Sequence, residues 1–297
     1  MDRDKLIPIF EMLRKDTLNH EEASKKIEII FNCYKEKKEK GILYSKEDYM
    51  PEVIIASYFT YINRSDMEDI YSYFKAKYIY NENKLEQVHE WDEIKGMGVV
   101  YDYITDYKDY EKVNIYTLLN IHQKLFSLVP NPSVGGKFRE QNSYLLGNSV
   151  TLSDYKQIPA EIAKLYTESI NLAKTGIKLR EDAPAEDIID YIDNAVELSC
   201  KLIKIHPFYD GNGRSTRALL NIYFKMAGIP PVYVTYKERD EYLDGMAKAI
   251  RDKDYNPDYS SIKKFYYYKI CDSLVELDII KDKRKGKIRE LEKFIKK

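Results

Sequence analysis

One twelve-residue stretch, HPFYDGNGRSTR at residues 206–217, combines side chains that can do phosphate chemistry. Pro207 ends the helical pattern before it and another helical pattern follows it, so the stretch is a loop between two helices. Gly211 and Gly213 permit positive φ angles, with which successive N–H groups can converge on one point. The N-terminus of the next helix adds free N–H donors and a partial positive charge. These features predict an anion cradle of the kind that holds phosphate.

The charged residues of this stretch suit the same ligand. Arg214 and Arg217 are three residues apart in the first helical turn, where a cation opposes the helix dipole unless an anion reverses the effect. Guanidinium groups bind phosphate in bidentate fashion, and Asp210 offers one carboxylate that could share Mg²⁺ with phosphate oxygens. His206 titrates near neutral pH. It is therefore either a general base for a hydroxyl that attacks phosphorus or a cap on the last carbonyls of its helix.

Composition narrows the possible partners and location. The chain has 297 residues, 44% hydrophobic, and a formal net charge of −1, so no global attraction to nucleic acid or to an anionic membrane is expected. No apolar run is long enough for a spanning helix or a signal peptide, which favours a cytoplasmic protein or an effector exported without a cleaved signal. A reduced compartment fits three widely separated cysteines, Cys33, Cys200 and Cys271.

Helical periodicity dominates the chain. Apolar residues recur at three- and four-residue steps over 187–205, and further amphipathic helices are expected over 214–227, 112–128 and 158–174. Strand-like alternation is confined to residues 136–153, which are expected to form one isolated hairpin. The sequence therefore predicts an all-α fold with a small β-hairpin.

Residues 206–217 fit the signature HPFx(D/E)GNGRxxR at every fixed position, so the chain resembles the Fic-domain family of protein adenylyltransferases. The resemblance implies a Fic-type helical core with a β-hairpin flap. It also implies transfer of AMP from ATP, with Mg²⁺, to a Ser, Thr or Tyr hydroxyl of a target protein and of the enzyme itself, with release of pyrophosphate. The alternatives are removal of AMP, transfer of another nucleotide or phosphate group, or a non-catalytic nucleotide-binding regulator.

The resemblance assigns roles residue by residue. It implies that His206 is the base and that Asp210 is the ligand of Mg²⁺. It places Arg214 on the β-phosphate and Arg217 on the γ-phosphate. The loop that holds the α- and β-phosphates comprises Gly211, Asn212 and Gly213.

The segment GGKFRE, residues 135–140, is similar to the opening of the Fic flap. In the family such a hairpin, here 136–153, docks the target protein, and Lys137 and Phe138 are expected to contact ATP. A flap strand could pair with an extended target segment. The alternative is a plain surface hairpin.

Residues 80–90, YNENKLEQVHE, resemble the inhibitory helix that some Fic proteins carry, with the pattern (S/T)xxxE(G/N). The resemblance implies that Glu86 pairs with Arg217 and displaces the γ-phosphate. Two positions depart from the pattern, because Glu82 replaces the hydroxyl residue and Gln87 the small residue. Glu86 is thus either inhibitory or an ordinary solvated glutamate, and in the first case it could also orient water for removal of AMP.

The rest of the chain divides around these motifs. We expect a helical extension over 1–80, a Fic domain over 81–275 with an inhibitory-type helix near 81–90, and a charged C-terminal helix over 276–297. Tyr242 is either an adenine contact, by resemblance, or a core tyrosine. The oligomeric state stays open.

Overall fold

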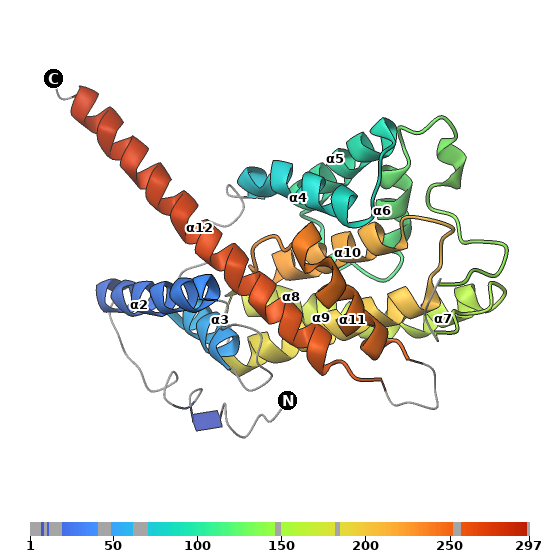
Figure 1. The fold of residues 1–297 in the computed structure, drawn as a ribbon, viewed down its shortest axis with the longest axis horizontal. Coiled ribbons are helices and arrows are strands. Elements are labelled where there is room, and N and C mark those ends of the chain that lie inside the picture. The colour runs from blue at the N-terminus through green and yellow to red at the C-terminus, as the bar shows by residue number, and fades with distance from the viewer. Residues whose placement is uncertain are drawn as a thin grey trace.

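The computed structural model describes residues 20–40, 49–61, 71–145, 150–181, 185–251 and 257–295, together with residues 7, 8 and 11. Regular structure within these ranges is helical throughout, which confirms the all-α class (Figure 1). The described parts of the expected flap, 136–145 and 150–153, contain no strand, and its turn at 146–149 lies outside the described residues.

The longer helices surround one central element (Figure 1). In chain order they are α2 (His20–Glu39), α3 (Met50–Tyr61), α4 (Tyr71–Leu85), α5 (Trp91–Asp106), α6 (Thr117–Leu125), α7 (Ile158–Lys164), α8 (Tyr166–Glu181), α9 (Ala185–Ile205), α10 (Asn212–Met226), α11 (Arg239–Ala249) and α12 (Ser260–Ile295). Short 3₁₀ turns are η3 (Tyr110–Lys112), η4 (Pro132–Val134) and η5 (Tyr236–Glu238).

Helix α10 lies at the centre of the fold. It packs against α5, α6, α8 and α9, and every residue of it except Gly213 is buried. Its polar residues can be buried because they have partners. Lys225, for example, donates to the carbonyls of Ile104 and Tyr107 at 3.1 and 3.2 Å, and so caps the C-terminal end of α5. The site loop precedes α10 and is therefore fixed by the best-packed element.

The helices expected over 187–205, 214–227 and 112–128 correspond to α9, α10 and α6. The helix expected over 158–174 is divided into α7 and α8 at Leu165, whose N–H bonds a carbonyl three residues back. The domain boundaries expected after residues 80 and 275 both fall inside helices, α4 and α12 respectively.

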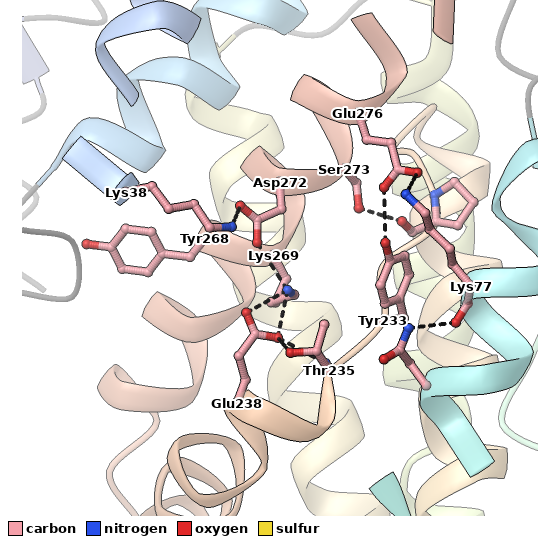
Figure 2. Close-up of polar contacts among 12 residues, drawn as sticks. Lys38, Lys77, Tyr233, Thr235, Glu238, Tyr268, Lys269, Asp272, Ser273 and Glu276 are labelled. Atoms are coloured by element: carbon pink, nitrogen blue, oxygen red, sulfur yellow. Dashed lines mark hydrogen bonds and ion pairs between the residues drawn. The ribbon is translucent and has the colours of Figure 1, made fainter. Parts of the chain in front are cut away.

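Helix α12 lies across the bundle and connects its outer elements (Figure 1). Figure 2 shows a network of charges in which Lys269 of α12 contacts Glu238 of η5 at 2.8 Å and Asp272 at 3.1 Å, while Asp272 also binds Lys38 of α2. Glu276 joins α12 to Lys77 of α4 in the same view. The N-terminal helices are thereby attached to the C-terminal helix. None of the helices in the described ranges has the length and apolar character required to cross a bilayer.

Candidate active site

The site loop begins where α9 ends. His206 follows the last residue of α9 with φ 52°, and Gly211 turns the chain into α10 with φ 72°. A side chain at position 211 would meet the ring of Phe126 at 2.8 Å, so both the backbone angle and the packing require glycine there. Residues 206–211 thus form the loop that connects the end of α9 to the start of α10.

Asn212 holds the loop in this shape. Its Oδ1 accepts a hydrogen bond from the N–H of Phe208 at 2.9 Å, and its Nδ2 donates to the carbonyl of Phe208 at 2.8 Å. The side-chain amide is therefore used to fold the loop. Of the polar groups of Asn212, its backbone N–H remains for a phosphate.

His122 of α6 joins this loop to the start of the expected flap. Its Nδ1 accepts a hydrogen bond from the N–H of Gly136 at 2.8 Å, so its proton is on Nε2, which donates to the carbonyl of Asp210 at 3.0 Å. The ring stacks on Phe208 with centroids 3.7 Å apart. Burial lowers the pKa of His122 to about 4. His122 is therefore a neutral packed residue that positions two segments of the site.

Arg139 fastens the flap segment to the end of α9. It is 2% exposed, and its guanidinium donates to the carbonyls of His206 at 2.8 Å and Ile205 at 3.4 Å. It also donates to the carbonyls of Gln141 at 2.7 Å and of Ser153 on the returning arm. The two arms are thus joined through a side chain. Sequence reasoning did not identify Arg139. The signal available in the sequence was an arginine directly after Phe138 in a chain whose cations are mostly lysine.

His206 is suited to accept a proton. Burial lowers its pKa from the usual value, although the nearby carbonyl of Ile203 opposes the effect, so the imidazole is neutral at pH 7. Its Nδ1 is buried and has no hydrogen-bond partner among the described residues. Arg139 donates to the backbone carbonyl of His206 and so fixes the backbone at this residue.

Arg214 points its guanidinium into the same space. Its side chain is 1% exposed, and Nη2 contacts Glu93 of α5 at 2.8 Å and Asp210 at 3.4 Å. Nε and Nη1 are buried and find no partner within the part of the chain that the structure describes. Buried donors without partners are costly. Arg214 is therefore ready for a further anionic ligand. Sequence reasoning also missed Glu93.

Arg217 has carboxylates on both sides. Nη2 donates to Glu86 at 2.7 Å, Nε donates to Glu82 at 2.8 Å, and Nη1 faces the hydroxyl of Tyr242 at 3.5 Å. Burial opposes the charge of this arginine, but the two glutamates outweigh it and raise the pKa of Arg217. The structure thus brings together Glu86 and Arg217, the pair expected from the inhibitory pattern.

The carboxylate of Glu86 lies directly against the first turn of α10. A Cβ atom at Gly213 would stand 2.2 Å from Oε1 of Glu86. Burial acts against ionisation of Glu86, yet the contact with Arg217 outweighs it and lowers the pKa of this carboxyl. An ionised carboxylate therefore occupies the position where a phosphate would approach the loop.

The remaining candidate site residues differ in how exposed they are. Asp210 is exposed at the mouth of the site, and its Oδ1 accepts a hydrogen bond from Gly211 at 2.6 Å. Lys137 is exposed, whereas Phe138 packs near Phe208 with ring centroids 6.2 Å apart. Tyr242 is 3% exposed, which places it in the core beneath Arg217. The described residues hold no cluster of three metal-ligating side chains.

Comparison with known proteins agrees with this geometry. Residues 112–224 match the family model described as the Fic/DOC family. The chain is 28% identical over 171 residues to the Protein adenylyltransferase Fic of Drosophila ananassae, covering 57% of this chain and 31% of that protein. It is 30% identical over 164 residues to the protein of the same name from Culex quinquefasciatus, covering 54% and 30%. The chain thus spans about a third of the length of these curated relatives.

Solved structures share the fold. A Fic-domain-containing signaling protein from Bacteroides thetaiotaomicron superposes with a TM-score of 0.57 at 18% identity, covering 75% of this chain and 95% of that chain. A fragment of Fic-1 from C. elegans gives a TM-score of 0.53 at 17% identity, covering 76% and 68%. The chain therefore shares the fold of these Fic-domain structures, and its residues 112–224 match the Fic/DOC family model.

Proposed function

We propose that this chain is a protein adenylyltransferase, which moves AMP from ATP to a hydroxyl of a target protein and of itself. The observation that carries the proposal is the pair of buried donors on Arg214, in the first turn of α10, that find no partner among the described residues. Such donors fit a phosphate chain. The matching relatives are named for the same activity.

The chain's own residues supply the steps of transfer. The neutral imidazole of His206 takes the proton of the attacking hydroxyl. The hydroxyl oxygen then bonds to the α-phosphorus, and the bond from this phosphorus to the oxygen bridging to the β-phosphate breaks, so that pyrophosphate leaves. The loop amides and Arg214 stabilise the charge that develops on the phosphates. Arg139 holds the backbone of His206 in place during the reaction.

Asp210 would hold Mg²⁺. An exposed single carboxylate at the mouth of the site fits a metal shared with phosphate oxygens and does not fit an all-protein metal cage. When bound, Mg²⁺ would neutralise part of the phosphate charge. The target protein would dock on the segment 136–153, in which Arg139 donates to the carbonyl of His206 at 2.8 Å.

The proposal is tested by intact-mass analysis after incubation with ATP and Mg²⁺. Glu86→Gly should gain the mass of adenylate faster than the parent chain, because the carboxylate leaves the loop at Gly213. Adding His206→Ala to this variant should slow the gain by about a hundredfold or more. Equal adducts with and without His206 would show that it is not the base. Loss of adenylate from a modified target would instead favour removal of AMP.

A further inference from the structure

Two carboxylates of the α4 segment contact the guanidinium of Arg217. Glu82 stands one helical turn before Glu86, and residues four apart share a helix face. Oε2 of Glu82 accepts from Nε of Arg217 at 2.8 Å, and Oε1 of Glu86 accepts from Nη2 at 2.7 Å. Sequence reasoning identifies Glu82 only as the loss of a hydroxyl residue. In the structure its carboxylate binds the arginine expected to reach the γ-phosphate.

The two carboxylates differ in how easily a ligand can displace them from Arg217. The side chain of Glu86 is 37% exposed and follows the last residue of α4, whereas that of Glu82 is 0% exposed within the helix. A ligand can displace Glu86 by a side-chain rotation, but it can displace Glu82 only if α4 moves. Arg239 opposes such a movement because its Nε donates to the carbonyl of Leu85 at 3.2 Å.

Glu82 remains on Arg217 after Glu86 leaves. The pKa of Glu82 is raised overall, because burial and the charge of Glu86 together outweigh the contact with Arg217. Departure of Glu86 therefore removes one influence that favours protonation of Glu82. An ionised carboxylate at hydrogen-bond distance cancels much of the attraction that a guanidinium offers to another anion.

Arg214 differs from Arg217 in this respect. Arg214 keeps two buried donors, Nε and Nη1, that are unpartnered among the described residues. All three nitrogens of Arg217 face protein oxygens, those of Glu82, Glu86 and Tyr242. Arg214, expected to contact a β-phosphate, thus still has donors available for a ligand. Arg217, expected to contact a γ-phosphate, already has protein oxygens at all of its nitrogens.

We propose that Glu82 is a specificity-determining residue, which neutralises Arg217 independently of Glu86 and makes the site favour a nucleoside diphosphate over a triphosphate. The inference rests on the function proposed above and on the resemblance to the Fic family, which implies that Arg217 contacts the γ-phosphate of ATP. Removal of the Glu86 carboxylate frees the space beside Gly213 for a phosphate. The attraction for a triphosphate returns in full only when the charge of Glu82 is removed as well.

The test measures dissociation constants of ADP and ATP, with Mg²⁺, by isothermal titration calorimetry on the full chain. The proteins are the parent, Glu86→Gly, Glu82→Gln and the double variant. Glu86→Gly should still bind ATP no more tightly than ADP. The double variant should bind ATP about tenfold more tightly than Glu86→Gly, because a like charge next to the γ-phosphate is gone. The affinity for ADP should change by less than about threefold, because ADP does not reach Arg217.

Glu90→Gln is the matched control, since Glu90 is an exposed carboxylate eight residues from Glu82 that has no side-chain cap contact. It should leave both constants unchanged. The inference is overturned if Glu82→Gln leaves the ratio of ATP to ADP affinity unaltered in the Glu86→Gly background. It is also overturned if Glu82→Gln weakens ATP binding, because Glu82 would then only orient Arg217.

One result would overturn the inference without any substitution of Glu82. If Glu86→Gly by itself binds ATP more than about tenfold more tightly than ADP, Glu82 does not neutralise Arg217. This result stands even if the buried substitution fails to fold. Failure of Glu86→Gly to bind either nucleotide would instead refute the proposed function, so the two failures are distinguishable.

Discussion

At the scale of single residues, the site depends on side chains that are held in one protonation state. His122 accepts a hydrogen bond at Nδ1 from Gly136 and donates one at Nε2 to Asp210. A protonated imidazole has two donors and no acceptor, so protonation would break the bond with Gly136. The link between the flap segment and the loop therefore requires the neutral ring.

His122 should make the stability of the protein depend on pH. Its pKa is about 4 in the folded chain, below the 6.5 of an unperturbed histidine, so the unfolded chain binds the proton first as the pH falls. The free energy of unfolding is therefore highest above pH 6.5 and declines toward pH 4, by about 3 kcal/mol from this residue.

Urea unfolding at pH 7 and at pH 4.5 measures this effect. His122→Gln should be less stable than the parent at pH 7, and the difference should shrink by about 2 kcal/mol at pH 4.5. A difference that stays constant between the two pH values would contradict the assignment.

At the scale of elements, the end of α9 and the flap segment act together. The carbonyls at the end of a helix need donors, and Arg139 supplies them to Ile205 and His206 while it also binds Gln141 and Ser153. One side chain thus fixes the backbone of the proposed general base, His206, and the segment proposed to receive the target. No β-ladder occurs between the described arms, 136–145 and 150–153, so this arginine carries much of their connection.

Arg139→Ala should slow transfer more than it weakens nucleotide binding. His206 would lose its backbone support, and a displacement of about 1 Å at the reacting groups lowers a rate by about a hundredfold, while the ATP dissociation constant should stay within about threefold. Single-turnover kinetics and calorimetry in the Glu86→Gly background separate the two quantities. Lys156→Ala, which removes an exposed cation from the returning arm, is the control. Equal losses in both variants would argue against a positioning role.

At the scale of the whole molecule, helices that are far apart in sequence support the site. Helix α4 brings Glu82 and Glu86 to Arg217, and α12 holds α4 and η5 through the ion pairs of Figure 2. Lys269 is the most buried cation of that network, with a side chain 6% exposed between Glu238 and Asp272. Burying such charges is favourable only while they remain paired.

Lys269→Met should therefore destabilise the protein strongly. The change leaves Glu238 and Asp272 without their shared cation, and the loss of one partner from a buried pair costs about 3 kcal/mol or more in free energy of unfolding. Lys112→Met breaks an exposed pair with Asp109, in which the two side chains are 77% and 68% exposed, and should leave the free energy of unfolding nearly unchanged. Chemical denaturation compares the two variants. Similar losses would show that the network of Figure 2 contributes little.

Much of the fold and part of the site could be predicted before the structure. Apolar periodicity is a local property, and it located α6, α9 and α10 because each presents a face to the core. It failed at the break at Leu165 and predicted a hairpin ladder over 136–153 that the described residues do not show, since both depend on contacts with other segments. The four-residue spacing of Glu82 and Glu86 was visible, but the shared partner was not.

The sequence by itself determined the loop between two helices, the positive-φ glycine at its turn, Gly211, and the chemical types of His206, Asp210, Arg214 and Arg217, because turn formation and ligand chemistry are properties of neighbouring residues. Gly213, also expected at a turn, lies instead in the first turn of α10. Only the tertiary structure decided what these groups contact. Glu82, Glu93, His122 and Arg139 reach the site from segments 67 to 135 residues away in sequence from the partners they bind there. Such contacts are set by how helices pack, and no local pattern encodes them.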